Sequence, residues 1–344
     1  MSWRKHFTPV DNSGLPLNVQ SNDSSGPGAA ANQLASWLPE VYTGQPNRVE
    51  RYAQYDQMDM DSEINAALPF PQQVLELARL FRERLTTLVA NWIRVGYCQG
   101  NFNSDNCAAG GYTLDYGPFG FCELFDPRFQ PWTGGGEHFC FFNQPAAAEA
   151  NYQMFWSALR PLLEGDAEAL AQLDALREGF NQAMGTALEA MWCRKLGLPR
   201  YDDGLLKDLL QLLASSRADY TAAFRALSDL PEQVEPLKAA FYLPIDAELE
   251  QRWSAWLERW HGQTSADAKA TMRSANPQIT WREWLVAPAY ERAAEGDLSL
   301  IRELQAVFRD PYARPPAELA ATYDQLKPRE FFNAGGLSHY SCSS

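Results

Sequence analysis

Positive charge and histidine are scarce in this sequence. Its 344 residues hold 29 Lys and Arg against 43 Asp and Glu, a formal net charge of -14, and only four His. Such an acidic surface argues against broad binding to nucleic acids or anionic membranes. The four His are scattered, so neither a Ser-His-Asp nor a Cys-His arrangement can be assembled from them. These absences argue against direct nucleic-acid contact and against His-dependent catalysis.

Long apolar runs and paired cysteines are missing as well. No stretch approaches the roughly 20 apolar residues of a membrane span, and the basic N-terminus has no apolar segment behind it, as a signal peptide would. We therefore expect a cytoplasmic protein with no membrane partner. The six Cys form no CxxC pair, so buried thiols are expected for most of them. Cys342 is the exception, because it lies near the chain end, where reactivity is expected.

The residues that carry chemistry gather in one stretch, residues 95–121, VGYCQGNFNSDNCAAGGYTLDYGPFGF. Asp105 and Asn106 are adjacent, Asp115 follows in Asp-Tyr-Gly, and Gly110-Gly111 between them predicts a tight turn into a short strand. Mg²⁺ prefers hard oxygen ligands, and protein kinases use an Asp for the acceptor hydroxyl and an Asn and an Asp for the metals. The pattern predicts Asp105 as base and Asn106 and Asp115 as metal ligands. On spacing alone, two simple turns explain the motifs equally well.

The same stretch resembles the selenoprotein O (SelO) family, through GYCQGNFNSDN at 96–106 and LDYGPFGF at 114–121. Further motifs follow in family order up to residue 344: FDP at 125–127, FNQP at 142–145, KLGL at 195–198, DYT at 219–221 and SCSS at 341–344. The resemblance covers about residues 70–344. It implies a kinase-fold protein adenylyltransferase, which transfers AMP from ATP to protein Ser, Thr or Tyr hydroxyls with Mg²⁺ or Mn²⁺. It also implies the same three roles for Asp105, Asn106 and Asp115.

The sequence departs from the family pattern in three places. Gln99 stands where the family has a His, a change expected to matter little because an amide also donates and accepts hydrogen bonds. Cys342 matches the family's selenocysteine or redox-active Cys, but the partner Cys after Asp-Tyr-Gly is not evident. Residues 1–70 contain no glycine-rich loop and no strand lysine. We therefore expect the N-terminal kinase lobe to be absent and the activity of this chain to be weak or lost.

The first 70 residues divide into two segments. Residues 1–33 are rich in Asn, Ser, Gly and Pro and are predicted to be disordered. Residues 34–68 resemble the start of a cyanophage-type portal vertex protein, at WLPEVY (37–42) and RYAQYDQMDMDSEINAAL (51–68). The boundary is predicted at Leu68–Pro71, where two prolines interrupt a helix. Besides an enzyme, the sequence allows a non-catalytic helical remnant or a phage structural protein.

From residue 70 onward, apolar periodicity predicts a mainly α fold. The expected architecture is a protein-kinase-like C lobe with a short β hairpin at the metal motif and a helical C-terminal extension. Helices are expected at 72–93, 143–163, 167–196 after the N-cap Asp166, 204–214, 218–227, 247–262, 265–274, 282–295 and 298–308. The tryptophans at helical spacing are predicted to be core residues: Trp253, Trp256, Trp260, Trp281 and Trp284.

Overall fold

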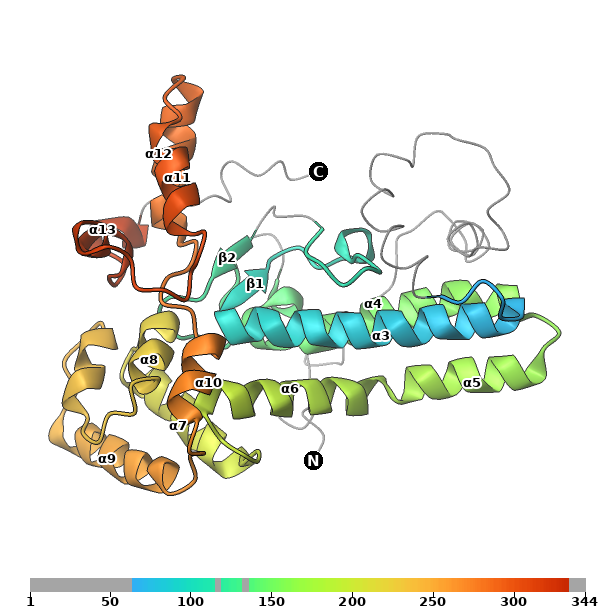
Figure 1. Ribbon diagram of the computed structural model, residues 1–344, viewed down its shortest axis with the longest axis horizontal. Coiled ribbons are helices and arrows are strands. Elements are labelled where there is room, and N and C mark those ends of the chain that lie inside the picture. The colour runs from blue at the N-terminus through green and yellow to red at the C-terminus, as the bar shows by residue number, and fades with distance from the viewer. Residues whose placement is uncertain (1–63, 115–118, 132–135, 334–344) are drawn as a thin grey trace. The chain divides into compact units, whose positions relative to one another are not determined.

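A computed structural model of the chain describes residues 64–114, 119–131 and 136–333 (Figure 1). These residues belong to two compact units. The first contains residues 64–90, 102–114 and 143–187, and the second contains residues 91–101, 119–131, 136–142 and 188–333. The predictions for residues 1–33, for most of the 34–68 segment, for Asp115 and for Cys342 fall outside the described residues.

Four long helices contribute to the first unit. They are α3 (Phe70–Val95), α4 (Gln144–Leu159), α5 (Ala167–Glu178) and α6 (Phe180–Leu196), of which α3 and α6 continue into the second unit. A short 3-10 helix at Ser104–Asn106 and another at Arg160–Leu163 complete it. The predicted helices at 72–93 and 143–163 are thereby confirmed, the second with its last turn tightened to 3-10 geometry.

The core of the first unit lies between α3 and α4, which run side by side in Figure 1. The apolar stripe of α3 is buried as its periodicity predicts, with Val74, Leu77 and Phe81 all at 2% exposure or less. The ring of Phe81 lies 4.5 Å from that of Phe155, and the hydroxyl of Tyr152 donates to the carbonyl of Ala78 at 2.9 Å. Aromatic packing and one buried hydrogen bond therefore fix the two helices together.

The long helix predicted at 167–196 is wrong in one respect, because the structure breaks it at Gly179. Asp166 caps α5 as predicted, accepting from the amide of Ala169 at 2.9 Å. In a continuous helix the Leu176 carbonyl would accept from the amide four residues later, but here the Arg82 guanidinium donates to it at 3.2 Å. A Cβ on Gly179 would lie 2.9 Å from that guanidinium. The break thus accommodates a side chain from 97 positions earlier in the chain, a contact that periodicity does not encode.

The second unit holds the one sheet found among the described residues, two antiparallel strands that pair Tyr97 with Phe121 and Cys98 with Gly120. Its helical elements are shorter than those of the first unit. The sheet and helices are β1 (Tyr97–Gln99), β2 (Phe119–Phe121), α7 (Asp203–Ser215), α8 (Tyr220–Leu227), α9 (Ala247–His261), α10 (Ala268–Ala275), α11 (Glu283–Ala294), α12 (Ser299–Val307) and α13 (Ala317–Tyr323), with 3-10 turns at Glu137–Phe139, Phe141–Asn143, Glu235–Ala240 and Arg329–Asn333.

Tryptophans form the core around α9, as predicted. Trp253, Trp256 and Trp260 are at most 3% exposed, and their indole N–H groups donate to Ser216 Oγ (2.6 Å), the Leu205 carbonyl (2.9 Å) and the Leu196 carbonyl (2.8 Å). These rings are therefore structural rather than a stacking platform. The prediction is wrong for Trp281, which is 40% exposed, because it precedes the first residue of α11 and helical spacing does not apply to it.

The C-terminal helices α11, α12 and α13 share a smaller apolar cluster of their own, in which Trp284, Leu285, Leu304 and Tyr323 are buried. Helix α13 was not predicted, since Pro315 and Pro316 mark its start as a linker. Proline is nevertheless compatible with the beginning of a helix, where no amide donor is needed. None of the helices formed by the described residues combines the length and the apolarity of a membrane span.

Candidate catalytic site

Asp105 and Asn106 lie on the 3-10 turn Ser104–Asn106 in the first unit. The turn is closed by the amide of Asn106 donating to the Asn103 carbonyl (3.0 Å) and the amide of Cys107 donating to the Ser104 carbonyl (3.3 Å). Ser, Asp and Asn favour such turns because their side chains compete with regular backbone hydrogen bonding. The Asp105 side chain is exposed and Asn106 is half-buried. A carboxylate in this position is accessible to an acceptor group.

The predicted hairpin after the turn is present in reduced form. Cys107 and Thr113 make an isolated antiparallel bridge in place of a strand, with a turn at Ala109–Gly110. Gly111 has φ +75°, and a Cβ there would lie 2.5 Å from Cβ of Arg84 on α3. Glycine is required for both reasons, because it tolerates positive φ and allows close backbone approach. The small hairpin is thereby held against α3.

The third predicted ligand, Asp115, lies outside the described residues, so its distance from Asp105 and Asn106 stays a prediction. Within the described ranges, no group of three or more His, Cys, Asp or Glu side chains is arranged to hold a metal ion. The carboxylate of Asp105 and the amide oxygen of Asn106 are nevertheless hard donors of the kind that Mg²⁺ prefers. The amide oxygen of Asn106 is thus of the ligand type expected for one position of a magnesium site, whose other predicted ligand is Asp115, and Asp105 stays the predicted base.

Neutral side chains in the second unit hold the residues that lead into the turn. Gln99 is 1% exposed, accepts a hydrogen bond from the Tyr97 hydroxyl and directs its amide nitrogen toward the Asn101 carbonyl at 3.5 Å. Gln130 donates to the Gly100 carbonyl at 3.4 Å. The amide of Gln99 thus donates and accepts, as expected for the position where the family has a His.

The cysteines beside the sheet are structural. Cys98 and Cys122 are buried, and burial raises the pKa of both thiols above the ordinary value. Burial also raises the pKa of the Cys107 thiol to about 12. A thiol with a raised pKa forms little thiolate and is a poor nucleophile. The prediction of ordinary buried thiols is therefore confirmed for Cys98 and Cys122, whereas Cys107 is half-buried.

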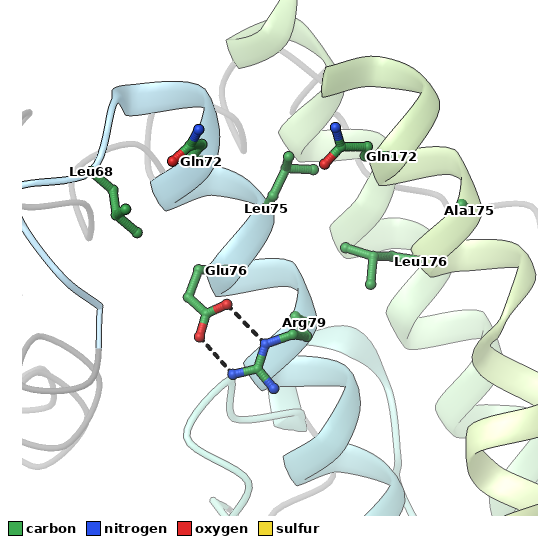
Figure 2. Close-up of a pocket in the computed structure, with 8 residues that line it drawn as sticks. All are labelled: Leu68, Gln72, Leu75, Glu76, Arg79, Gln172, Ala175 and Leu176. Carbon is green, nitrogen blue, oxygen red and sulfur yellow. Dashed lines mark hydrogen bonds and ion pairs between the residues drawn. The ribbon is translucent and has the colours of Figure 1, made fainter. Parts of the chain in front are cut away.

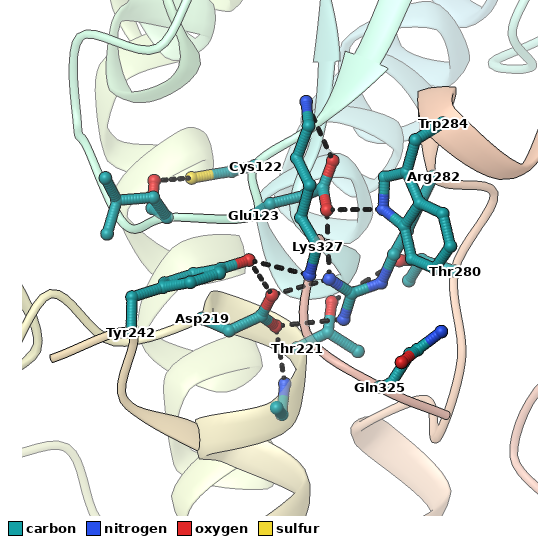
Figure 3. Close-up of polar contacts among 12 residues, drawn as sticks. Cys122, Glu123, Asp219, Thr221, Tyr242, Thr280, Arg282, Trp284, Gln325 and Lys327 are labelled. Carbon is teal, nitrogen blue, oxygen red and sulfur yellow. Dashed lines mark hydrogen bonds and ion pairs between the residues drawn. The ribbon is translucent and has the colours of Figure 1, made fainter. Parts of the chain in front are cut away.

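A buried ion network lies beyond β2 in the second unit, and sequence reasoning missed it (Figure 3). The guanidinium of Arg282, 4% exposed, donates to both carboxylate oxygens of Asp219 at 2.5 and 3.0 Å and to Glu123 at 3.1 Å. Asp219 is fully buried and also caps α8, accepting from the amide of Ala222 at 2.9 Å. The bidentate geometry is the strong form of an Arg–carboxylate pair.

Three further side chains close the network. The Tyr242 hydroxyl donates to Asp219 at 3.0 Å, the Trp284 indole donates to Glu123 at 2.9 Å, and the Lys327 ammonium lies 3.8 Å from Glu123. Burial raises the pKa of Glu123 and outweighs the opposing effect of Arg282 and Lys327. Burial alone would lower the pKa of Arg282, but Asp219 and then Glu123 raise it. In the sequence, the only indication of this network was the DYT motif at 219–221. That motif contributed to the family resemblance, but no role was assigned to Asp219.

A second buried cation in this unit is Lys195, of the KLGL motif. Its ammonium donates to the Arg94 carbonyl (2.8 Å) and to Asn276 Oδ1 (2.9 Å) and lies 3.7 Å from the centre of the Phe224 ring. Burial, and secondarily Arg94, lowers the pKa of Lys195 well below its ordinary value. The Arg94 carbonyl belongs to the last turn of α3, where a cation also interacts favourably with the helix dipole. Lys195 therefore fastens the end of α3, two residues before β1 begins.

A groove of the first unit lies between α3 and α5 and does not include the turn (Figure 2). Its volume is about 530 Å³, and its lining is mixed: Leu68, Gln72, Leu75, Glu76, Arg79, Gln172, Ala175 and Leu176. Arg79 is paired with Glu76 through two hydrogen bonds of 2.8 and 2.6 Å. Because this cation is already neutralised, the groove offers no free positive charge for a triphosphate.

Comparison with known proteins defines the class. The family model described as protein adenylyltransferase SelO matches residues 52–309, and the chain belongs to this family. It is 33% identical over 278 residues to the protein nucleotidyltransferase YdiU of Aromatoleum aromaticum and 34% identical over 277 residues to that of Xanthomonas campestris, covering 76% of this chain and 52% of each relative. With the YdiU of Thiobacillus denitrificans it shares 37% identity over 265 residues, 72% of this chain and 51% of the relative. The chain thus spans about half the length of the curated relatives it matches.

These matches correct one expectation. The family match begins at residue 52, inside the segment 34–68 that the sequence likened to a phage portal protein. The portal-like origin of that segment finds no support in the comparisons. The N-terminal kinase lobe was predicted to be absent from residues 1–70. The structure describes these residues only from Ile64 onward, so this stays a prediction.

Proposed function

We propose that this protein transfers AMP from ATP to Ser, Thr or Tyr hydroxyl groups of other proteins, with Asp105 as general base. The observation that carries the proposal is an exposed carboxylate on a fixed turn, in a chain that belongs to the SelO family. Hydrogen bonds close the turn, and the hairpin that follows it approaches α3 closely at Gly111. A general base must be both accessible and positioned, and Asp105 meets both conditions.

In the proposed reaction the acceptor hydroxyl oxygen bonds to the α-phosphorus of ATP. The bond between that phosphorus and the oxygen bridging to the β-phosphate breaks, and pyrophosphate leaves. Asp105 takes the proton that the hydroxyl loses. Asn106 and Asp115 are the residues that would hold Mg²⁺ or Mn²⁺, which when bound neutralises phosphate charge. Asp105 is not paired to a cation by any ion pair found among the described residues, so its carboxylate is available for this proton.

The extent of activity is part of the proposal. Nucleotidyl transfer depends on positioning and charge neutralisation, and residues 1–70 contain neither a glycine-rich loop nor a strand lysine. We therefore expect transfer by this chain to be slow. The kinase-like C-lobe architecture belongs to the same proposal, and the helical composition and the pairing of β1 with β2 are compatible with it.

The test is incubation of the purified chain and an unstructured acceptor protein with ATP labelled on either the α- or the γ-phosphate, with Mg²⁺ or Mn²⁺. We expect label from the α position alone to become attached to protein. Asp105→Asn should reduce this at least about 100-fold, the usual contribution of a general base. Asp310→Asn is the matched control, because Asp310 is also exposed and accepts from nearby backbone amides.

Two results would contradict the proposal. Attachment of γ-label instead would identify a phosphotransferase. No attachment of either label by a chain that is folded by circular dichroism would leave the non-catalytic helical protein as the better interpretation.

A further inference from the structure

One buried amide, Asn151 on α4, contacts the chain just before the Asp105–Asn106 turn. Its Nδ2 donates to the carbonyl of Phe102 at 3.0 Å, in a buried hydrogen bond. Both residues belong to the first unit. A single side chain therefore anchors the backbone at the residue that precedes the four-residue stretch containing the turn.

Burial makes this contact energetically significant. Asn151 is 8% exposed and Phe102 is 1% exposed, so water does not readily replace a lost donor. A buried carbonyl that loses its hydrogen-bond donor keeps the cost of its desolvation without the compensating bond. The backbone would relieve that cost by moving, and the first residues to move are those of the adjacent turn.

The chemistry of the contact also suits a catalytic base. An amide carries no net charge, so it fixes the backbone without pairing with the Asp105 carboxylate or altering its charge state. A Lys or Arg in the same position would compete with the acceptor hydroxyl for that carboxylate.

Other neutral amides hold the neighbouring carbonyls. Gln130 donates to the Gly100 carbonyl at 3.4 Å, and Gln99 approaches the Asn101 carbonyl at 3.5 Å, both within the second unit. With Asn151 and Phe102, three consecutive carbonyls each accept from a side-chain amide. Of these contacts, the Asn151 bond is the shortest and is fully buried.

We propose that Asn151 is a positioning residue for the transfer reaction: it fixes the backbone at Phe102, just before the turn, and thereby keeps the Asp105 carboxylate and the Asn106 amide in their working positions. The inference rests on the proposed function for its catalytic consequence. Its structural part, the restraint of the turn, is measurable whether or not the chain is active.

The experiment uses the full chain and three variants. Asn151→Ala removes the side chain, and Asn151→Asp keeps its shape while placing an oxygen against the Phe102 carbonyl. Asn181→Ala is the matched control, because Asn181 is a part-buried amide of the same unit that donates to Glu149 at 2.8 Å, away from the turn. Hydrogen exchange followed by mass spectrometry reports peptides that contain the Asn106 and Cys107 amides, which close the turn.

We expect exchange of those amides to accelerate at least about tenfold in both Asn151 variants and to stay unchanged in Asn181→Ala. Peptides from α9 report global unfolding and should exchange as in the parent chain. In the AMP-transfer assay, kcat should fall about 10- to 100-fold, the effect of misplacing a catalytic group by about 1 Å, while KM for ATP changes less than about threefold.

The outcomes separate the two proposals. Unchanged exchange at the turn in both Asn151 variants would overturn the restraint, and accelerated exchange with unchanged kcat would overturn the positioning role. The Asn151 variants could show accelerated exchange while the parent chain transfers no AMP. That result would support the restraint and count against the proposed function. If Asn151→Ala unfolds, as seen in the α9 peptides, the isosteric Asn151→Asp variant decides.

Discussion

The Asp105–Asn106 turn and the Arg282 network are held by opposite kinds of interaction. Around the turn the buried anchor is a neutral amide, Asn151, which donates to a carbonyl. In the second unit the anchor is a buried guanidinium between two carboxylates, Asp219 and Glu123. Of these two polar centres, only the Arg282 network is charged.

This difference in charge predicts that the Arg282 network contributes mainly to stability and that the residues around the turn contribute mainly to function. Losing a neutral hydrogen bond costs about 1 kcal/mol and affects its neighbours. Losing one partner of a buried ion pair leaves an uncompensated charge and costs several times more. We therefore expect loss of the Arg282 guanidinium to lower the stability of the protein strongly, and mutations around the turn to change the local order and chemistry of the turn.

The largest expected effect comes from Arg282→Met. The substitution leaves the buried carboxylates of Asp219 and Glu123 with Lys327 as the nearest cation, 3.8 Å from Glu123. The free energy of unfolding, measured by denaturant titration, should fall by about 3–5 kcal/mol. Arg259→Met is the control, because Arg259 pairs with Asp208 at the surface and should change stability by less than about 1 kcal/mol. Equal losses in the two variants would refute the contrast between buried and exposed charge.

A smaller effect is expected from Gly111→Ala, which acts on the neutral region. The added Cβ would lie 2.5 Å from Cβ of Arg84, at a residue with φ +75°. Gly165→Ala is a matched control, since Gly165 has φ +95° but no atom within 4 Å of the added Cβ. Both variants acquire backbone strain of about 1–2 kcal/mol, and only Gly111→Ala adds a clash.

We expect Gly111→Ala to lose about 1–2 kcal/mol more than its control, the usual cost of overpacking. The additional loss should be accompanied by faster hydrogen exchange at residues 107–113. Identical stabilities of the two alanine variants would mean that the hairpin is not held against α3.

The same two regions show which features of the fold and the site could be predicted from the sequence. Helix α3 and the core tryptophans of α9 follow from periodicity, because burial of one helix face repeats every three to four residues. Asp105 and Asn106 could be singled out because they are adjacent in the chain. Asn151 could not, since its partner Phe102 lies 49 positions away. Arg282 and Asp219 are 63 positions apart. Contacts of that separation are created by the fold and leave no local pattern.

The smallest expected effect is a change in pH dependence, produced by Glu123→Gln. Burial raises the pKa of Glu123 above its ordinary value near 4.5, so the folded protein binds this proton more tightly than the unfolded chain. Stability from this group is therefore greatest at low pH and is lost as pH rises from about 4.5 through the raised pKa. The glutamine variant lacks this titration, so the unfolding free energy of the parent relative to the variant should decline with rising pH. Each unit of pKa elevation corresponds to about 1.4 kcal/mol.

Denaturant titrations of the parent and variant chains between pH 4.5 and 7.5 measure that decline, with Glu258→Gln, at an exposed position of α9, as the control that should run parallel to the parent. A flat difference for Glu123→Gln would show that Arg282 and Lys327 compensate the buried carboxylate fully. The stability contributed by the Arg282 network would then be independent of pH between pH 4.5 and 7.5, as expected for the neutral Asn151 contact. The two anchors would no longer differ in pH dependence.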